Sequence, residues 1–298
     1  MADTIKIGNL DISSFKVGTN DCKIYLGTTK LYPNETPSHD YSQDYLTFIP
    51  TAPTKFKYTD TSYKNKLYYS VNGGSSWSSL SRGSYSITFT AGQKVMWKGT
   101  CQPYINGGLY KGICQFSSSG GTFSVEGNVM SLLFSDNFIG QTSLNAYLGA
   151  FVQLFYACAS LINIDNIVLP ATTLDVNCYT NMFNSCTSLT SVPSNLLPAT
   201  TLSYSCYSSM FKGCTSLTKA PELPATTLVG DCYYGMFAGC SSLNYIKCLA
   251  TDISASNCTG NWVNGVASSG TFVKDASMTN WTTGNDGIPS NWAVTDNT

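Results

Sequence analysis

The chain has 298 residues, a formal net charge of −1 and only 11% charged residues. Nucleic-acid binding depends on clustered Lys and Arg, and the sequence has no such cluster and a single arginine, Arg82. No apolar run approaches the ~20 residues of a membrane span. The opening MADTIKIGNL lacks the apolar core of a signal peptide. We therefore expect synthesis in a cytoplasm. The length of the chain suits two or three modest domains.

The first 44 residues predict a small β unit and a linker. Residues 1–35 alternate apolar and polar side chains, and Gly27 to Thr29 is typical of a turn between short strands. Residues 36–44 are polar, contain proline and show no period, which predicts a linker.

Residues 45–141 predict an all-β, sandwich-like domain. Its short runs YLTFIP, KFKYT, KLYYSV, YSITFT, KVMWKG, GTFSV and VMSLLF are rich in β-formers and are separated by glycine turns. Trp77 lies on the second arm of a predicted hairpin. Its flat ring is a candidate sugar platform, because aromatic faces stack on apolar surfaces; a core position is the alternative.

A repeated motif organises the rest of the chain. It reads CYTNMFNSCTSL from Cys178, CYSSMFKGCTSL from Cys206 and CYYGMFAGCSSL from Cys232. Its register extends back to Ala150 and forward to Cys258, with spacings of 28, 28, 26 and 26 residues. Divergent ends are expected where terminal repeats cap a shared core. The pattern predicts five turns of a solenoid.

Each repeat predicts one helix followed by one strand. Motif positions 0, 1, 4, 5 and 8 fall within an arc of about 140 degrees on a helix, so Cys178, Tyr179, Met182, Phe183 and Cys186 should face the core. A leucine and a short extended piece follow, and we expect these pieces to stack as parallel strands. One strand, one turn and one helix every 26 to 28 residues lies within the range of leucine-rich repeats.

Eight of the twelve cysteines lie in two repeat columns, and we predict that they are buried thiols. Residues eight apart on a helix are separated by about 12 Å, which is beyond disulfide reach and too far for one pair to chelate a metal. The pattern assigns no role to Cys22, Cys101, Cys114 and Cys248.

The pattern MFxGCtSLtxaPxLPATTL resembles the BspA-like leucine-rich repeats of gut anaerobes and of their phages. The resemblance covers residues 143–298 and includes a C-terminal cap (243–298) with GTFVKD and GIPSNW. The β domain, with SVNGGSSW and NVMSLLF, resembles the domain that often precedes such repeats. The commoner repeat is shorter and carries more isoleucine on its strands. KIYLGTTKLYP resembles a motif near the start of phage virion and tail-associated proteins.

The resemblance implies a multidomain, mainly β protein with α/β repeats that acts in adhesion. We expect a non-enzymatic phage virion protein, which would be a head or tail fibre or a capsid-decorating protein on the particle surface. Residues 1–35 would attach it to other virion proteins. Its repeats would bind host-surface or mucin glycans, and a homo-oligomer, with a trimer favoured, is expected. The alternatives are a bacterial cell-surface BspA-like adhesin and a glycan-active enzyme.

The residues themselves predict no catalytic, cofactor-binding or metal-binding group. The only histidine, His39, lies in the predicted linker, and no nucleophile motif or phosphate-binding loop is present. Four lysines against eight acids in the repeats, a net charge of −4, disfavour an acidic capsule as ligand. Candidate ligand-facing residues, apart from Trp77, lie on the strand side: Thr190, Ser191, Thr218, Lys219, Asn244 and Tyr245.

Overall fold

The computed structural model describes residues 39–59, 65–106 and 109–297, together with six short strands among the first 38 residues. The chain divides into two compact units, Met1–Asp40 and Tyr41–Thr298. Strands dominate both, and the described residues contain one short α-helix, so the predicted mainly β class is confirmed. The boundary predicted between residues 141 and 142 falls inside the second unit and stays a prediction.

The described residues of the first unit form three antiparallel strand pairs, in keeping with the predicted short strands. The predicted turn at Gly27 and Thr28 lies outside the described residues, as does Cys22. The strand pairs are β1 (Ile5–Ile7) with β2 (Leu10–Ile12), β3 (Lys16–Val17) with β4 (Asn20–Asp21), and β5 (Ile24–Leu26) with β6 (Thr29–Tyr32).

The second unit begins with a 3-10 helix, η1 (Tyr41–Gln43), inside the stretch predicted as a linker. The carbonyl of Asp44 accepts a hydrogen bond from the Asn128 amide at 2.9 Å. The last residues of the predicted linker are therefore part of this folded unit, while residues 36–38 lie outside the description.

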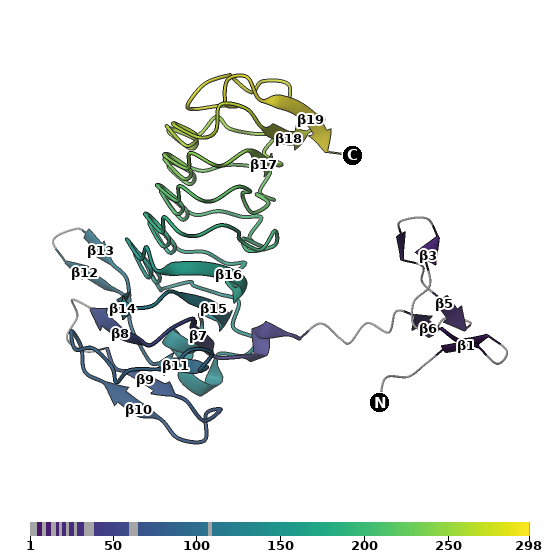
Figure 1. Ribbon diagram of the computed structural model, residues 1–298. Coiled ribbons are helices and arrows are strands. Elements are labelled where there is room, and N and C mark those ends of the chain that lie inside the picture. The colour runs from purple at the N-terminus through teal and green to yellow at the C-terminus, as the bar shows by residue number, and fades with distance from the viewer. Residues whose placement is uncertain are drawn as a thin grey trace. The chain divides into compact units, whose positions relative to one another are not determined.

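Two sheets form the start of the second unit (Figure 1). The larger has the order β10-β9-β11-β7-β15-β16, and the smaller pairs β14 with β8. The bounds are β7 (Leu46–Pro50), β8 (Thr54–Thr59), β9 (Leu67–Ser70), β10 (Ser78–Leu80), β11 (Val95–Gly99), β14 (Gln115–Gly120) and β15 (Phe123–Asn128), with a separate hairpin of β12 (Tyr104–Asn106) and β13 (Leu109–Lys111).

Aromatic side chains fill the space between these sheets. Phe48 on β7 packs against Phe56, Trp97, Phe116 and Phe123, with ring centroids 4.9–5.4 Å apart. All five side chains are fully buried. Because these rings come from strands of both sheets, one aromatic core joins the sheets, and we name this part of the unit the sandwich region. A sandwich fold for it stays a prediction.

The prediction of a strand at VMSLLF, residues 129–134, is wrong. This segment contains the short helix α1 (Ser131–Phe134), followed by the 3-10 helix η2 (Ser135–Asn137). The buried Ser131 hydroxyl donates to the Trp97 carbonyl at 2.9 Å and accepts from the Leu46 amide at 3.1 Å. These tertiary bonds to two strands hold the segment against the larger sheet, and they override its β propensity.

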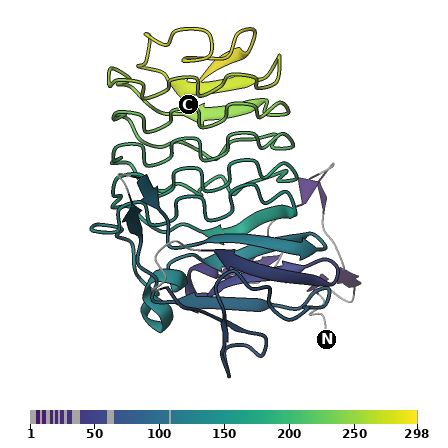
Figure 2. The same cartoon turned by 90° about the vertical axis from the view of Figure 1, so that its left-hand side faces the viewer.

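Residues 144–297 form five successive segments, which we name coil 1 (144–171), coil 2 (172–199), coil 3 (200–225), coil 4 (226–251) and coil 5 (252–297). Figures 1 and 2 show them one above another. Backbone hydrogen bonds join neighbouring coils at an offset of one repeat, as from Tyr179 N to Cys206 O (2.9 Å). Coil 1 continues the larger sheet, because β16 (Leu161–Val168) pairs in parallel with β15.

The predicted strand is present in only some coils. β17 (Tyr245–Cys248), β18 (Thr271–Asp275) and β19 (Ala293–Asn297) form a parallel sheet. Coil 3 makes only isolated parallel bridges in this region, such as Lys219 to Tyr245, and residues 188–199 of coil 2 form neither a strand nor a bridge. Pro193 and Pro221 stand in these two segments, and proline removes an amide donor from a strand ladder.

The predicted helix of the repeat motif is wrong, because these residues form a run of turns. Met182 N donates to Tyr179 O, three residues back (3.2 Å), and the next amide, of Phe183, donates to Met210 O in the next coil (2.9 Å). Every fourth residue has positive φ, as at Asn181 (57°). An α-helix of L-residues does not tolerate this. The same conformation recurs at Asn177, Ser185, Ser205, Ser209, Gly213, Asp231, Gly235, Gly239, Asn257, Asn261 and Gly265.

The predicted inward positions are nevertheless confirmed. Each four-residue turn places two side chains in the core and two outside, so positions 0, 1, 4, 5 and 8 are buried, as they would be on a helix. Tyr179 stacks on Tyr207 at 5.7 Å and Phe183 on Phe211 at 5.5 Å, with rings within 11° of parallel. Trp262 closes the columns by stacking on Trp281.

The eight cysteines of the repeat columns are buried thiols, in agreement with the prediction: Cys158, Cys178, Cys186, Cys206, Cys214, Cys232, Cys240 and Cys258. Cys248, to which the pattern assigns no role, is a buried thiol as well. Cys186, Cys214 and Cys240 each donate to the carbonyl of a phenylalanine in the preceding coil, at 3.0–3.1 Å. Burial raises the pKa of Cys240 to about 12. These thiols therefore pack as small apolar groups and are not nucleophiles at neutral pH.

Candidate functional site

No group of three or more His, Cys, Asp or Glu side chains suited to a metal ion occurs among the described residues. The other candidates for a functional site are the outward side chains of the coils. Two such surfaces exist, because each coil has a strand side and a turn side.

The structure brings the six strand-side candidates together in two neighbouring columns. In the first column, Thr218 N donates to Thr190 O (3.4 Å) and Asn244 N donates to Thr218 O (3.0 Å). In the second, Lys219 pairs with Tyr245 in a parallel bridge. Ser191 precedes Lys219 by one repeat. We name this surface, built from coils 2 to 4, the strand face.

Lys219 and Tyr245 contact each other on the strand face. The Lys219 ammonium lies 4.9 Å from the centre of the Tyr245 ring. Lys219 is exposed and Tyr245 half-buried. A cation–π contact at an exposed site is worth about 0.5–1 kcal/mol, so it orients both side chains and leaves the exposed Lys219 ammonium accessible to a ligand.

Charges on the strand face are paired between adjacent coils. Ser191 Oγ donates to Asp165 Oδ1 at 2.7 Å. The Lys247 ammonium of coil 4 lies 3.3 Å from Glu222 Oε1 of coil 3, and beyond the strand face, within coil 5, Lys274 Nζ lies 2.6 Å from Asp296 Oδ1. The result is a polar surface on which the Lys219 ammonium rests on a ring and the Lys247 ammonium is paired with a carboxylate.

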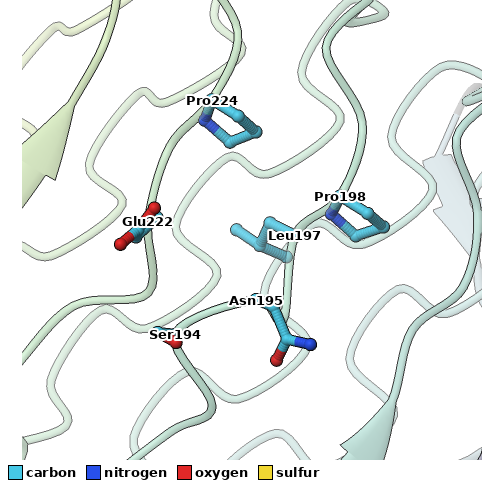
Figure 3. A pocket seen from close by; sticks show the side chains of 6 residues that line it. All are labelled: Ser194, Asn195, Leu197, Pro198, Glu222 and Pro224. Carbon is cyan, nitrogen blue, oxygen red and sulfur yellow. The ribbon is translucent and has the colours of Figure 1, made fainter. Parts of the chain in front are cut away.

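A pocket of about 270 Å³ lies at the end of the strand segments of coils 2 and 3. Figure 3 shows Leu197 in the middle, between Glu222 and Pro198. The pocket is slightly smaller than typical small-molecule sites, and Glu222 is its only ionisable group. The lining residues are Ser194, Asn195, Leu197, Pro198, Glu222 and Pro224.

Trp77, the remaining candidate, lies in the sandwich region and not on the strand face. Lys98 Nζ lies 4.2 Å from the centre of its ring, and the Tyr45 ring meets it edge-on at 5.0 Å. Lys98 also pairs with Asp136 at 2.8 Å, and Tyr45 OH donates to the same carboxylate. Trp77 is half-buried with one ring face covered, which favours packing over sugar stacking.

This cluster perturbs the pKa values of two of its members. Burial, with the hydrogen bond to Asp136, raises the pKa of Tyr45 to about 12. Hydrogen bonds from Lys98 and Tyr45 lower the pKa of Asp136. Both shifts favour the protonation states already present at neutral pH, and these stabilise the cluster.

The sequence-based prediction missed two exposed tyrosines on the turn side. Tyr204 is 53% exposed and Tyr234 is 40% exposed. Each precedes, by one repeat, a glycine in the next coil, Gly230 and Gly260. An aromatic at an outward repeat position, followed by glycine at the same position of the next repeat, is the signal that identifies them.

No protein-family model, curated protein or solved structure matches this chain. Within the part of the chain that the structure describes, no helix has the length and apolar character that a membrane crossing requires.

Proposed function

We propose that residues 142–298 are a five-turn BspA-like leucine-rich-repeat solenoid with a C-terminal cap at 243–298. The inter-coil hydrogen bonds support this, because they recur at offsets of 25 to 27 residues, one residue less than the repeat: Phe155 N to Met182 O, Phe183 N to Met210 O, and Phe211 N to Met236 O. One buried leucine per repeat, at positions 161, 189, 217 and 243, supports it further.

The function best supported is non-enzymatic recognition from the surface of a phage particle. In this proposal the chain is a head fibre, tail fibre or capsid-decorating protein, and it assembles as a homo-oligomer, with a trimer as the favoured state. Residues 1–35 attach it to other virion proteins, since KIYLGTTKLYP resembles a motif of such proteins. The solenoid binds host-surface or mucin glycans.

The strand face is the observation that carries the recognition proposal. Coils 2 to 4 present hydroxyl, amide, ammonium and aromatic groups side by side, on a backbone joined by hydrogen bonds. Neutral sugars are bound by such groups, and a rigid scaffold holds them in place without an ordering cost on binding.

The particle setting is tested by purifying virions on a density gradient and identifying their proteins by mass spectrometry. The proposal expects this chain in fixed stoichiometry with the capsid proteins, and its loss from particles when residues 1–35 are deleted. Recovery in a bacterial envelope fraction and not in particles would contradict it and favour the bacterial adhesin.

The recognition role is tested on the strand face. Lys219→Ala and Tyr245→Ala should each lower adsorption of particles to host cells or mucin about tenfold. Lys212→Ala, which removes an exposed lysine from the turn side, is the matched control and should leave adsorption unchanged. Equal adsorption by all three variants would contradict a role for the strand face.

A further inference from the structure

Two exposed tyrosines lie on glycines in neighbouring coils. A Cβ added to Gly230 would lie 3.2 Å from Cδ2 and Cε2 of Tyr204. A Cβ added to Gly260 would lie 2.9 Å from Tyr234 Cδ2 and 3.1 Å from Cε2. Each ring therefore lies across a bare stretch of backbone, and the two share one arrangement in successive coils. A side chain at either glycine would displace the ring above it.

Asp231 is hydrogen-bonded to both tyrosines, to Tyr204 through its side chain and to Tyr234 through the backbone. Tyr204 OH donates to Asp231 Oδ2, and the Tyr234 amide donates to the Asp231 carbonyl at 3.1 Å. Asp231 is held at a positive φ of 54° by the turn. In the part of the chain that the structure describes, its Oδ1 has no hydrogen-bond partner and remains an acceptor for a ligand.

We propose that Tyr204, Asp231 and Tyr234 form a carbohydrate-binding platform whose ligand is a neutral hexose or N-acetylhexosamine glycan. The C–H faces of the sugar stack on the two rings, and a pair of hydroxyl groups donates to Asp231. This inference rests on the proposed recognition function and assigns it a second surface, on the turn side.

The chemistry of the platform selects neutral sugars. Aromatic faces attract the weakly positive C–H groups of a sugar ring, and hydrogen bonds to a carboxylate are stronger than neutral ones. An acidic sugar would meet the charge of Asp231 at close range, and the repeats already carry a net charge of −4. A protein partner needs about 1,000 Å² with an apolar centre, whereas the Ser208 hydroxyl donates to the Tyr234 carbonyl and places a polar group beside this tyrosine.

The platform is local to coils 3 and 4. The motif position of Tyr234 is occupied by Thr180 in coil 2 and Ser208 in coil 3. The position of Tyr204 is occupied by Val176 in coil 2 and Ser256 in coil 5. These neighbours offer no ring to stack on, so the ligand spans a short stretch of glycan.

The test is binding of the full chain to a printed array of galactose-, glucose-, mannose- and N-acetylglucosamine-terminated oligosaccharides, with their sialylated counterparts. The wild type should bind at least one neutral glycan, and binding should weaken at least tenfold in Tyr204→Ala and in Tyr234→Ala. Tyr156→Ala removes an exposed tyrosine from coil 1 and is the matched control. It should bind as the wild type does.

Conservative variants separate stacking from folding. Tyr204→Phe keeps the ring and should lose less glycan binding than Tyr204→Ala does. Asp231→Asn places a residue that tolerates the turn conformation and should weaken binding severalfold. No binding by the wild type, a preference for sialylated glycans, or unchanged binding in Tyr204→Phe, Asp231→Asn and Tyr234→Ala would overturn the proposal. Particle association is measured separately, so glycan binding without it contradicts only the virion setting.

Discussion

The sandwich region and the coils build their aromatic cores in different ways. In the sandwich, Phe48 meets Phe56 at 70° and Phe116 at 80°. In the coils, Phe155 meets Phe183 at 4°, and Phe183 meets Phe211 at 9°. The sandwich core joins unrelated positions, each with its own geometry. The coil core repeats one geometry, so each ring depends only on the coils above and below it.

Alkaline pH should separate the two regions most strongly. Burial raises the pKa of Cys206, Cys240 and Cys248 to about 12, from an ordinary value of 9.0. The unfolded chain therefore loses these protons first, and stability that is complete below pH 9 declines as pH rises toward 12. At pH 10 the three thiols together should lower the free energy of unfolding by about 4 kcal/mol.

The measurement is hydrogen exchange, read by mass spectrometry, from pH 7 to pH 10.5, after correction for intrinsic rates. Peptides from coils 2 to 4 should lose protection before those of β7 and β11. If protection were lost at the same pH in both regions, the thiols of the coils would not be the cause.

Truncating one core phenylalanine in each region should have the next largest effect. Phe48→Ala should destabilise by about 4–5 kcal/mol, because Phe48 contacts five other rings. Phe211→Ala should cost about 3 kcal/mol, because Phe211 stacks on two rings only. Urea unfolding of both variants measures the difference. Equal losses would show that the coil core is as densely connected as the sandwich core.

A smaller effect of opposite sign is expected at Tyr179. Its hydroxyl is buried, and within the described part of the chain it has no hydrogen-bond partner. Tyr179→Phe should therefore raise the free energy of unfolding by about 1 kcal/mol. Tyr234→Phe, at an exposed ring, is the control and should change stability by less than about 0.5 kcal/mol. A loss of stability in Tyr179→Phe would reveal a partner for the buried hydroxyl.

The sequence predicts which residues of the coils are buried better than it predicts their backbone. Positions 0, 1, 4, 5 and 8 satisfy a helix with 3.6 residues per turn and also a run of four-residue turns, so burial alone does not distinguish them. The distinguishing signal is the residue at every fourth position, such as Asn181, Gly213 and Gly239, because Asn and Gly favour positive φ. The strands of coils 2 and 3 were predicted from apolar spacing, and Pro193 and Pro221 argue against them.

The candidate sites also divide into residues that the repeat register groups correctly and residues for which it gives no information. Repeat register was sufficient to group Thr190, Thr218 and Asn244, since equivalent positions of adjacent repeats must be neighbours. The surroundings of Trp77 depend on Lys98 and Asp136, which lie on distant segments with no shared period. Tyr204 and Tyr234 were missed because, unlike the buried tyrosine column at positions 179, 207 and 233, they do not recur from coil to coil.

Two alanines test most directly whether the repeat motif is a run of four-residue turns. Ala157 has a φ of 56° on the exposed side of coil 1, whereas Ala238 is at a position without positive φ in coil 4. By urea unfolding, Ala157→Gly should raise the free energy of unfolding by about 0.5–1 kcal/mol, and Ala238→Gly should lower it by a similar amount. Loss of stability in both variants, as an α-helix requires, would contradict a run of four-residue turns.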